Sequence, residues 1–324
     1  MPACRHFHRR DCLKLLGTSA AAATLAATES WTLAESSAPL PVIDTHQHLW
    51  DLTKFKLPWH QSEDVASLRK SFVMSDYVAA TRDLNVVKTI YMEVDVAPDQ
   101  QVAEAEYVFD LCRRDDNTMA AAVISGRPAS PEFEAYIRRL AKSPYLKGVR
   151  QVLHGESTPP GYCLQPQFVK SVQLLGDLGL CYDLCMRPED LPDAVKLVDQ
   201  CPQTKFVIDH CGNMSVTSTD AALLQKWQTS MKELAARPNT VCKISGIVVT
   251  AEKDWKPADL APHINYSMNT FGADRVMFAG DWPVCTLRAS FAQWLNALKE
   301  IVKDRSPEFQ RKLFHDNAAK FYGV

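Results

Sequence analysis

Short apolar segments rich in β-branched residues alternate eight times along this chain with amphipathic segments. The apolar segments are continuous, which is typical of parallel strands covered on both faces. We expect these strands at residues 42–46, 86–94, 119–125, 148–153, 181–186, 205–209, 241–244 and 275–279. We expect the main helices at residues 100–114, 131–141, 167–178, 188–200, 221–236 and 289–303. Eight strand–helix repeats predict an α/β fold in the form of a closed (β/α)8 TIM barrel.

The barrel prediction has one alternative, an open doubly wound sheet. The nucleotide sites of that fold need a Gly-x-Gly-x-x-Gly turn after a strand, and the chain has no such turn. No Gly/Ser linker or run of charges divides residues 39–324, so we expect a single domain. The last helix, predicted at residues 307–322, should pack outside the barrel. Ser75 and Asp220 are the expected caps at the starts of two other helices.

Residues 1–38 carry a pattern that differs from the rest of the chain. A basic stretch with Arg9 and Arg10 precedes a short apolar run that ends at Ala27. This is the layout of a bacterial export signal, and the arginine pair resembles the twin-arginine type. The apolar run is too short to span a bilayer comfortably. We therefore expect a cleaved signal, no membrane span in the mature chain and a periplasmic location.

Charge and cysteine content narrow the choice of partner. The 36 Lys and Arg against 38 Asp and Glu leave a net charge of −2, which gives no electrostatic attraction to nucleic acid. Of the ten cysteines, Cys4 and Cys12 lie in the predicted signal, and the others form no Cys-x-x-Cys pair. We interpret most of them as buried small hydrophobes, with one or two disulfides left open. The expected partner is a small molecule, and a homo-oligomer is compatible with the sequence.

Polar residues gather where the predicted strands end, and chemistry sits at the carboxyl ends of the strands in (β/α)8 barrels. His46 and His48 are two residues apart at the end of the first strand, so both rings face the same side. His210 follows the sixth strand and Asp281 follows the eighth. Imidazole and carboxylate suit a divalent ion, with Zn²⁺ as the first choice. We therefore predict one metal site formed by these four residues.

Other residues near the same rim are candidates for binding the substrate. They are Trp50, Glu93, Arg150, His154 and Lys243. Arg150 and Lys243 would suit a carboxylate or a polyhydroxyl compound, the guanidinium through two parallel donors. Trp50 belongs to an aromatic loop that either forms a wall of the mouth or only caps the barrel.

Five motifs occur in order along nearly the whole predicted barrel. They are VIDTHQHLW at residues 42–50, KGVR at 147–150, DHCG at 209–212, CKISG at 242–246 and RVMFAGDWP at 275–283. Together they resemble the amidohydrolase superfamily, and most closely its amidohydrolase 2 branch, which holds sugar lactonases and pyrone-dicarboxylate lactonases.

The resemblance implies a TIM-barrel hydrolase that acts most typically on a lactone and holds at most one metal. It matches His46, His48, His210 and Asp281 to site positions of the family, and Arg150 to a position that anchors the substrate. The fourth strand lacks the lysine that bridges two metals in other branches, and the fifth strand lacks a histidine. A two-metal site is therefore not expected, and a mechanism without metal stays open.

Lactone hydrolysis requires an activated water, a polarised carbonyl and a protonated leaving oxygen. We expect Asp281 to act as general base and then as acid, and His210 to stabilise the oxyanion or complete a coordination shell. Two other functions stay open: a metal-dependent decarboxylase of the same superfamily, and a non-catalytic periplasmic protein that binds a sugar or an acid. Release of carbon dioxide would identify the first, and affinity without turnover the second.

Overall fold

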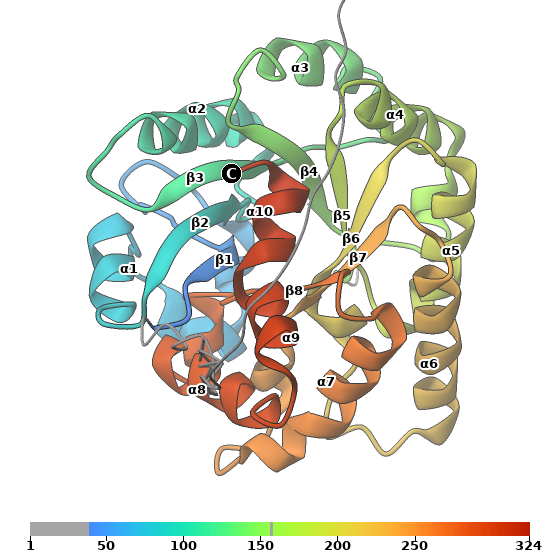
Figure 1. The fold of residues 1–324 in the computed structure, drawn as a ribbon. Helices are drawn as coiled ribbons and strands as arrows, with labels where there is room; N and C mark the ends of the chain where they lie inside the picture. The colour runs from blue at the N-terminus through green and yellow to red at the C-terminus, as the bar shows by residue number, and fades with distance from the viewer. Residues whose placement is uncertain (1–38, 156–157) are drawn as a thin grey trace, which may run out of the picture. The chain divides into compact units, whose positions relative to one another are not determined.

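The computed structural model describes residues 39–155 and 158–324, and these residues form an eight-stranded parallel barrel (Figure 1). Neighbouring strands pair in sequence order from β1 to β8. A parallel bridge between Gln47 and Trp282 joins the end of the sheet to its beginning. The strands are β1 (Val42–Gln47), β2 (Val86–Met92), β3 (Met119–Ser125), β4 (Leu146–Val152), β5 (Cys181–Cys185), β6 (Lys205–Ile208), β7 (Thr240–Ile244) and β8 (Val276–Phe278). The predicted single (β/α)8 barrel is confirmed.

Most helices surround the strands as an outer ring, and α10 lies across one end of the barrel (Figure 1). They are α1 (Met74–Ala80), α2 (Gln101–Cys112), α3 (Phe133–Leu140), α4 (Pro166–Asp177), α5 (Leu191–Gln200), α6 (Ala221–Ala235), α7 (Pro257–Phe271), α8 (Phe291–Ile301), α9 (Pro307–Arg311) and α10 (Asn317–Tyr322). Each longer helix buries apolar residues three or four positions apart, such as Trp227, Met231 and Leu234 of α6. The predicted amphipathic segments therefore cover the outside of the strands.

The end of the chain corrects one expectation. Helix α10 does not pack outside the ring, because Ala318 and Tyr322 join Val207 and other interior residues in one apolar cluster. The amide of Asn317 donates to the carbonyl oxygen of Val276 at 2.8 Å, at the start of β8. Helix α10 thus covers the amino-terminal end of the barrel, and this placement leaves the carboxyl end for the site.

The predicted helix caps agree with the structure only in part. The Asp220 carboxylate accepts from the backbone nitrogens of Ala222 and Leu223 at 2.9 and 3.0 Å, as expected of a cap on α6. Ser75 lies inside α1, which begins at Met74, so it is not a cap. A serine next to an acidic residue is compatible both with the cap and with the first turn of a helix, and the packing of the helix decides between these two positions.

The cysteines of the described chain support their interpretation as small hydrophobes. Eight cysteines between Cys112 and Cys285 are all buried, and none of these eight is paired in a disulfide. Burial raises the pKa of Cys201 and of Cys163 to about 12, so both thiols stay protonated at neutral pH. The barrel is therefore held together without cross-links among these residues.

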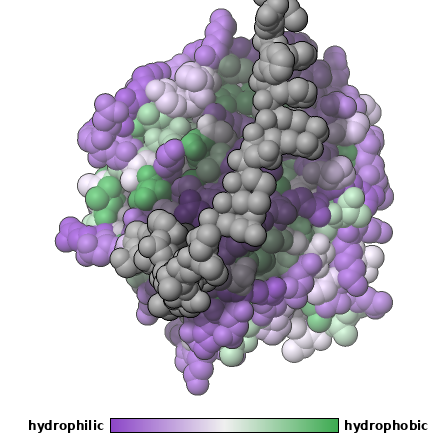
Figure 2. Space-filling model, in the orientation of Figure 1, coloured by the Kyte–Doolittle hydropathy of each residue, from purple (hydrophilic) through white to green (hydrophobic). Residues whose placement is uncertain are grey.

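The surface is mostly polar. On the face in Figure 2, hydrophilic side chains form most of the outline, and hydrophobic ones show in separate patches. The large hydrophobic residues exposed in the described part are Leu52, Val78 and Val87. None of the described helices is long and apolar enough to cross a membrane. The predicted export signal at residues 1–38 lies outside the described residues.

Candidate active site

A cavity of about 340 Å³ lies at the carboxyl ends of the strands. Residues that follow five different strands line it: His48 after β1, Asp95 after β2, His154 after β4, His210 after β6 and Asp281 after β8. Asp95, His210 and Asp281 have φ angles of 49°, 52° and 53°. This left-handed conformation is uncommon outside glycine and clusters at functional sites. The cavity therefore lies where the fold class places catalysis.

His46, His48 and Asp281 converge at the floor of the cavity. The two Nε2 atoms of the histidines are 3.1 Å apart. The Oδ1 atom of Asp281 lies 3.7 Å from Nε2 of His46 and 3.4 Å from Nε2 of His48. The backbone holds this arrangement, because the Asp281 nitrogen donates to the carbonyl oxygen of His46 at 2.9 Å. Three of the four predicted metal ligands are thus brought together.

The hydrogen bonds of the two histidines leave lone pairs at the point of convergence. Nδ1 of His48 lies 2.9 Å from the carbonyl oxygen of Met92, which can only accept, so this nitrogen carries the proton. Nδ1 of His46 lies 3.5 Å from a carboxylate oxygen of Asp209, which favours the same tautomer. Burial lowers the pKa of His46 well below its usual value, so the ring is neutral. The two Nε2 lone pairs and the Asp281 carboxylate therefore face one another. Nη1 of Arg150 lies 3.3 Å from Nε2 of His46 and donates to it, so a cation held by this nitrogen would replace that contact. With this exchange, the three donors fit a divalent cation.

His210 lies beside this group rather than within it. Its ring centroid is 4.5 Å from that of His46, and its ligand atoms group with His46 and Asp209 instead of with the other two predicted ligands. Nδ1 of His210 is 2.9 Å from the hydroxyl of Ser245. A Cβ atom on Gly246 would lie 2.4 Å from the His210 ring, so only glycine allows this close approach. Burial lowers the pKa of His210, which keeps the ring neutral.

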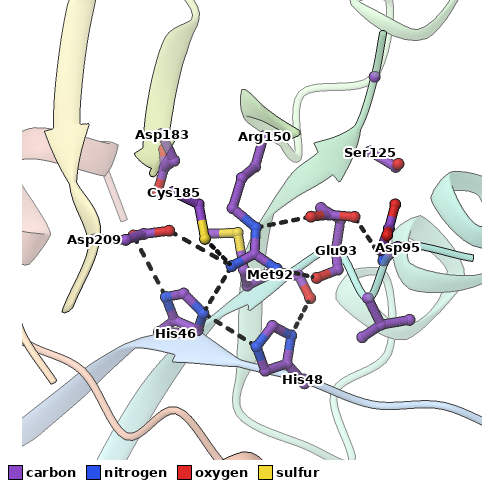
Figure 3. Close-up of polar contacts among 12 residues, drawn as sticks. His46, His48, Met92, Glu93, Asp95, Ser125, Arg150, Asp183, Cys185 and Asp209 are labelled. Carbon is purple, nitrogen blue, oxygen red and sulfur yellow. Dashed lines mark hydrogen bonds and ion pairs between the residues drawn. The ribbon is translucent and has the colours of Figure 1, made fainter. Parts of the chain in front are cut away.

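Behind the histidines, five buried charged side chains form what we call the buried charge network. Figure 3 shows Arg150 between Glu93 and Asp209, with Nε 2.8 Å from Glu93 and Nη1 3.5 Å from Asp209. The ammonium of Lys243 continues the network, at 3.2 Å from Asp209 and 2.5 Å from Asp183. Each of these five residues is at most 4% exposed. The network spans the barrel interior from β2 to β7.

The charges of this region do not balance within the chain. Burial raises the pKa of Asp183 to about 6, so this carboxyl is mostly ionised at neutral pH. Burial also acts to raise the pKa of Asp209, but Lys243 and His46 hold it well below its usual value. With Asp281, the region contains four carboxylates against two cations. This excess of negative charge is a second observation that fits a cation at the floor.

The structure places two predicted substrate-binding residues, Lys243 and Glu93, away from the cavity space. Lys243 is 0% exposed and its ammonium is bound by two carboxylates, so it cannot reach a substrate. Glu93 is also 0% exposed and holds Arg150 and the backbone nitrogen of Asp95. Trp50 lines the wall of the cavity, and its indole nitrogen donates to the Lys70 carbonyl oxygen at 2.6 Å. His154 and Arg150 remain in the lining.

Two members of the network, Asp183 and Asp209, carried no expected role. Asp183 alternates with Cys181 and Cys185 along β5, so the period of two points it into the barrel. A charged side chain in a buried strand needs a partner of opposite charge. That requirement is the sequence signal that could have paired Asp183 with Lys243. Asp209 had no separate signal, because it directly precedes the conspicuous His210.

Fold and site together define a (β/α)8 barrel of the kind that binds one metal through histidine and aspartate. The chain matches the amidohydrolase family of the amidohydrolase 2 type over residues 43–324 and belongs to it. It is 27% identical over 288 residues to an L-fucono-1,5-lactonase of Burkholderia ambifaria, covering 87% of this chain and 95% of that protein. It is 25% identical over 294 residues to an L-fucono-1,5-lactonase of Burkholderia multivorans, covering 87% and 96%. A solved amidohydrolase from Burkholderia multivorans with bound zinc superposes with a TM-score of 0.78 at 24% identity, covering 88% and 99%.

Proposed function

We propose that this protein hydrolyses a lactone at the floor of the cavity, with Asp281 as general base. The observation that carries this proposal is the convergence of His46, His48 and Asp281. The two Nε2 atoms and the carboxylate oxygen Oδ1 lie 3.1, 3.7 and 3.4 Å from one another. Membership of the amidohydrolase family and the lactonase names of two relatives support it. The position of Asp281 at the cavity surface, 4% exposed, leaves one face of the carboxylate open to water.

Three residues of the chain have different roles in the reaction. Asp281 accepts the proton of the attacking water and returns it to the ring oxygen as the carbonyl C–O bond breaks. Nδ1 of His210 lies 2.9 Å from the Ser245 hydroxyl. In the tautomer that the reaction uses, this hydroxyl donates to Nδ1, so Nε2 carries the proton and donates to the carbonyl oxygen as negative charge develops there. Arg150 keeps a fixed positive charge beside His46, with Nη1 3.3 Å from Nε2. The products are a carboxylic acid and an alcohol on one open chain.

We further propose that the cation held by His46, His48 and Asp281 is Zn²⁺. Two imidazoles and a carboxylate form a donor set that suits zinc and leaves a position for water. When bound, such an ion lowers the pKa of a water molecule and polarises a carbonyl. The contacts of both Nδ1 atoms, which turn the Nε2 atoms toward Asp281, and the negative charge of the floor support this choice of a divalent ion.

Metal analysis and a substrate screen test the proposal together. The purified protein should contain one divalent ion per chain, and His48→Ala should lower bound metal and activity in parallel. The screen measures acid release with a pH indicator across a panel of lactones, and carbon dioxide release from aromatic acids in the same preparation. Turnover of a lactone supports the proposal. Carbon dioxide release without acid release from any lactone would instead identify a decarboxylase.

We also propose that residues 1–38 direct export through a twin-arginine route to the periplasm. The support is the sequence alone: Arg9 and Arg10 before a short apolar run and small residues. This route carries folded proteins, which suits a site that takes up its ion before export.

A further inference from the structure

The wall of the cavity differs in chemistry from its floor. Two tryptophans and five valines stand among the lining residues above the histidines and Asp281. The indole nitrogen of Trp59 donates to the carbonyl oxygen of Val94 at 2.8 Å, and that of Trp50 donates to Lys70. Both indoles therefore have their polar atom bound by the protein and offer only carbon surface. A bound molecule meets polar groups at the reacting end and apolar ones around the rest.

Asn213, Thr250 and Asp95 in the wall each have a partner within the protein. The Asn213 amide donates to the carbonyl oxygen of Met186 at 2.8 Å. The Thr250 hydroxyl donates to a backbone carbonyl at 2.8 Å and accepts from a backbone nitrogen at 3.0 Å. Asp95 forms an ion pair with Arg127 at 2.6 Å. His154, exposed at the mouth, adds one polar contact, too few for a molecule with several hydroxyls.

The charges of the lining do not favour an anion. Arg150 is the only arginine or lysine among the described lining residues. Its guanidinium is only 5% exposed and is directed to Glu93 through Nε and through Nη2, at 2.8 and 2.7 Å. Asp95 and Asp281 add two carboxylates to the same lining. Since Asp95 is paired with Arg127 and Arg150 with Glu93, a carboxylate on the substrate would meet no free side-chain cation in the wall.

We propose that the substrate is a neutral lactone that carries an apolar alkyl or aryl substituent, rather than a sugar lactone or a carboxylated lactone. This proposal rests on the proposed lactone hydrolysis and names its substrate class. The lactone carbonyl lies against the polar floor, and the substituent lies between the tryptophans and the valines. Burying hydroxyl groups against this wall leaves them without partners, and an apolar pocket rejects an added hydroxyl by up to roughly 100-fold.

Three six-membered lactones test the substrate class on the zinc-loaded protein: δ-decalactone, D-glucono-1,5-lactone and a δ-lactone that carries a carboxylate. We expect kcat/KM for δ-decalactone to exceed the other two by roughly 100-fold after subtraction of the spontaneous rate. Equal or faster turnover of the polyhydroxylated or carboxylated lactone would overturn the substrate class and leave lactone hydrolysis standing. Absence of turnover with every lactone would overturn the proposed function as well.

A cation added to the wall gives a second, independent measurement. Val65 lines the cavity from an exposed segment, so Val65→Lys should fold and place an ammonium at the mouth. We expect kcat/KM for the carboxylated lactone to rise up to about 5-fold, as for an exposed ion pair, and that for δ-decalactone to fall. Val65→Met controls for side-chain length, and Val78→Lys places the same charge on α1, exposed and outside the lining. An unchanged ratio of the two substrates in Val65→Lys would count against the proposed orientation of the substituent.

Discussion

Lys243 is the position where a single substitution should cost the most stability. Its ammonium is fully buried, 2.5 Å from Asp183 and 3.2 Å from Asp209. At an effective dielectric constant of about 20, each contact is worth on the order of 5 kcal/mol before the desolvation of the charges is subtracted. Lys243→Met keeps the length of the side chain but leaves Asp183 without a cation and Asp209 with Arg150 alone. We expect the free energy of unfolding to fall by about 3–5 kcal/mol.

Urea unfolding of matched variants measures this effect. Lys243→Met combined with Asp183→Asn removes one charge of each sign, so the pair should regain more than half of the stability lost by Lys243→Met alone. Lys312→Met serves as the control. Lys312 forms ion pairs with Asp274 and Glu308 at 2.9 and 2.7 Å, but these partners are largely exposed. Its substitution should have far less effect, because surface ion pairs contribute little.

Two results would refute the reasoning about Lys243. A loss below about 1 kcal/mol in Lys243→Met would mean that the carboxylates take up protons or water at little cost. Additive losses in the double variant would mean that Lys243 and Asp183 act independently despite their contact. Either result would also remove the charge count as an argument for a divalent ion.

Three further predictions concern the reaction, the pH dependence of stability and the location of the protein. Asp281→Asn should lower kcat by about 10²–10⁴-fold with little change in KM, measured on the folded, metal-loaded variant. Burial, with the charge of Glu93, raises the pKa of Glu104 to about 8, so the unfolded chain loses a proton between pH 4.5 and 8 that the folded chain keeps. The free energy of unfolding of the wild type therefore falls as the pH rises through this window. In urea unfolding, the stability of Glu104→Gln relative to the wild type should increase from pH 5 to pH 8. Arg9→Lys with Arg10→Lys should leave the precursor in the cytoplasm, as shown by cell fractionation.

The barrel could be predicted from the sequence because its signal is repeated eight times. Each repeat combines a continuous apolar strand with an amphipathic helix, and only a few folds satisfy both. The strand bounds differ from the prediction by at most a few residues, and β3 (Met119–Ser125) agrees completely. Helix α10 could not be placed in this way, because its apolar face fits equally well against the ring or across the barrel end. Tertiary packing alone makes that choice.

The site was predictable where residue type and strand position agree. His46, His48 and Asp281 lie together because all three follow strands that are neighbours once the barrel closes. Lys243 and Glu93 lie deeper in the barrel than the cavity lining, for a physical reason. Sequence position gives the strand and the face of a residue but not its depth along the barrel axis. A charged side chain that lies deeper along the barrel axis pairs with other charged side chains of the protein instead of with a substrate.

The depth of a residue along the barrel axis determines whether it belongs to the apolar base, to the buried charge network or to the cavity. Along β5, Cys181 joins the apolar cluster under α10, Asp183 lies in the buried charge network, and Cys185 lines the cavity. Along β4, the same spacing of two places Arg150 in the network and Val152 in the cavity wall. The charges are therefore enclosed between an apolar base and a largely apolar wall. Apolar side chains screen charge poorly, so the fixed charges act strongly on the floor of the cavity. A substrate that is itself apolar would complete this enclosure when it binds.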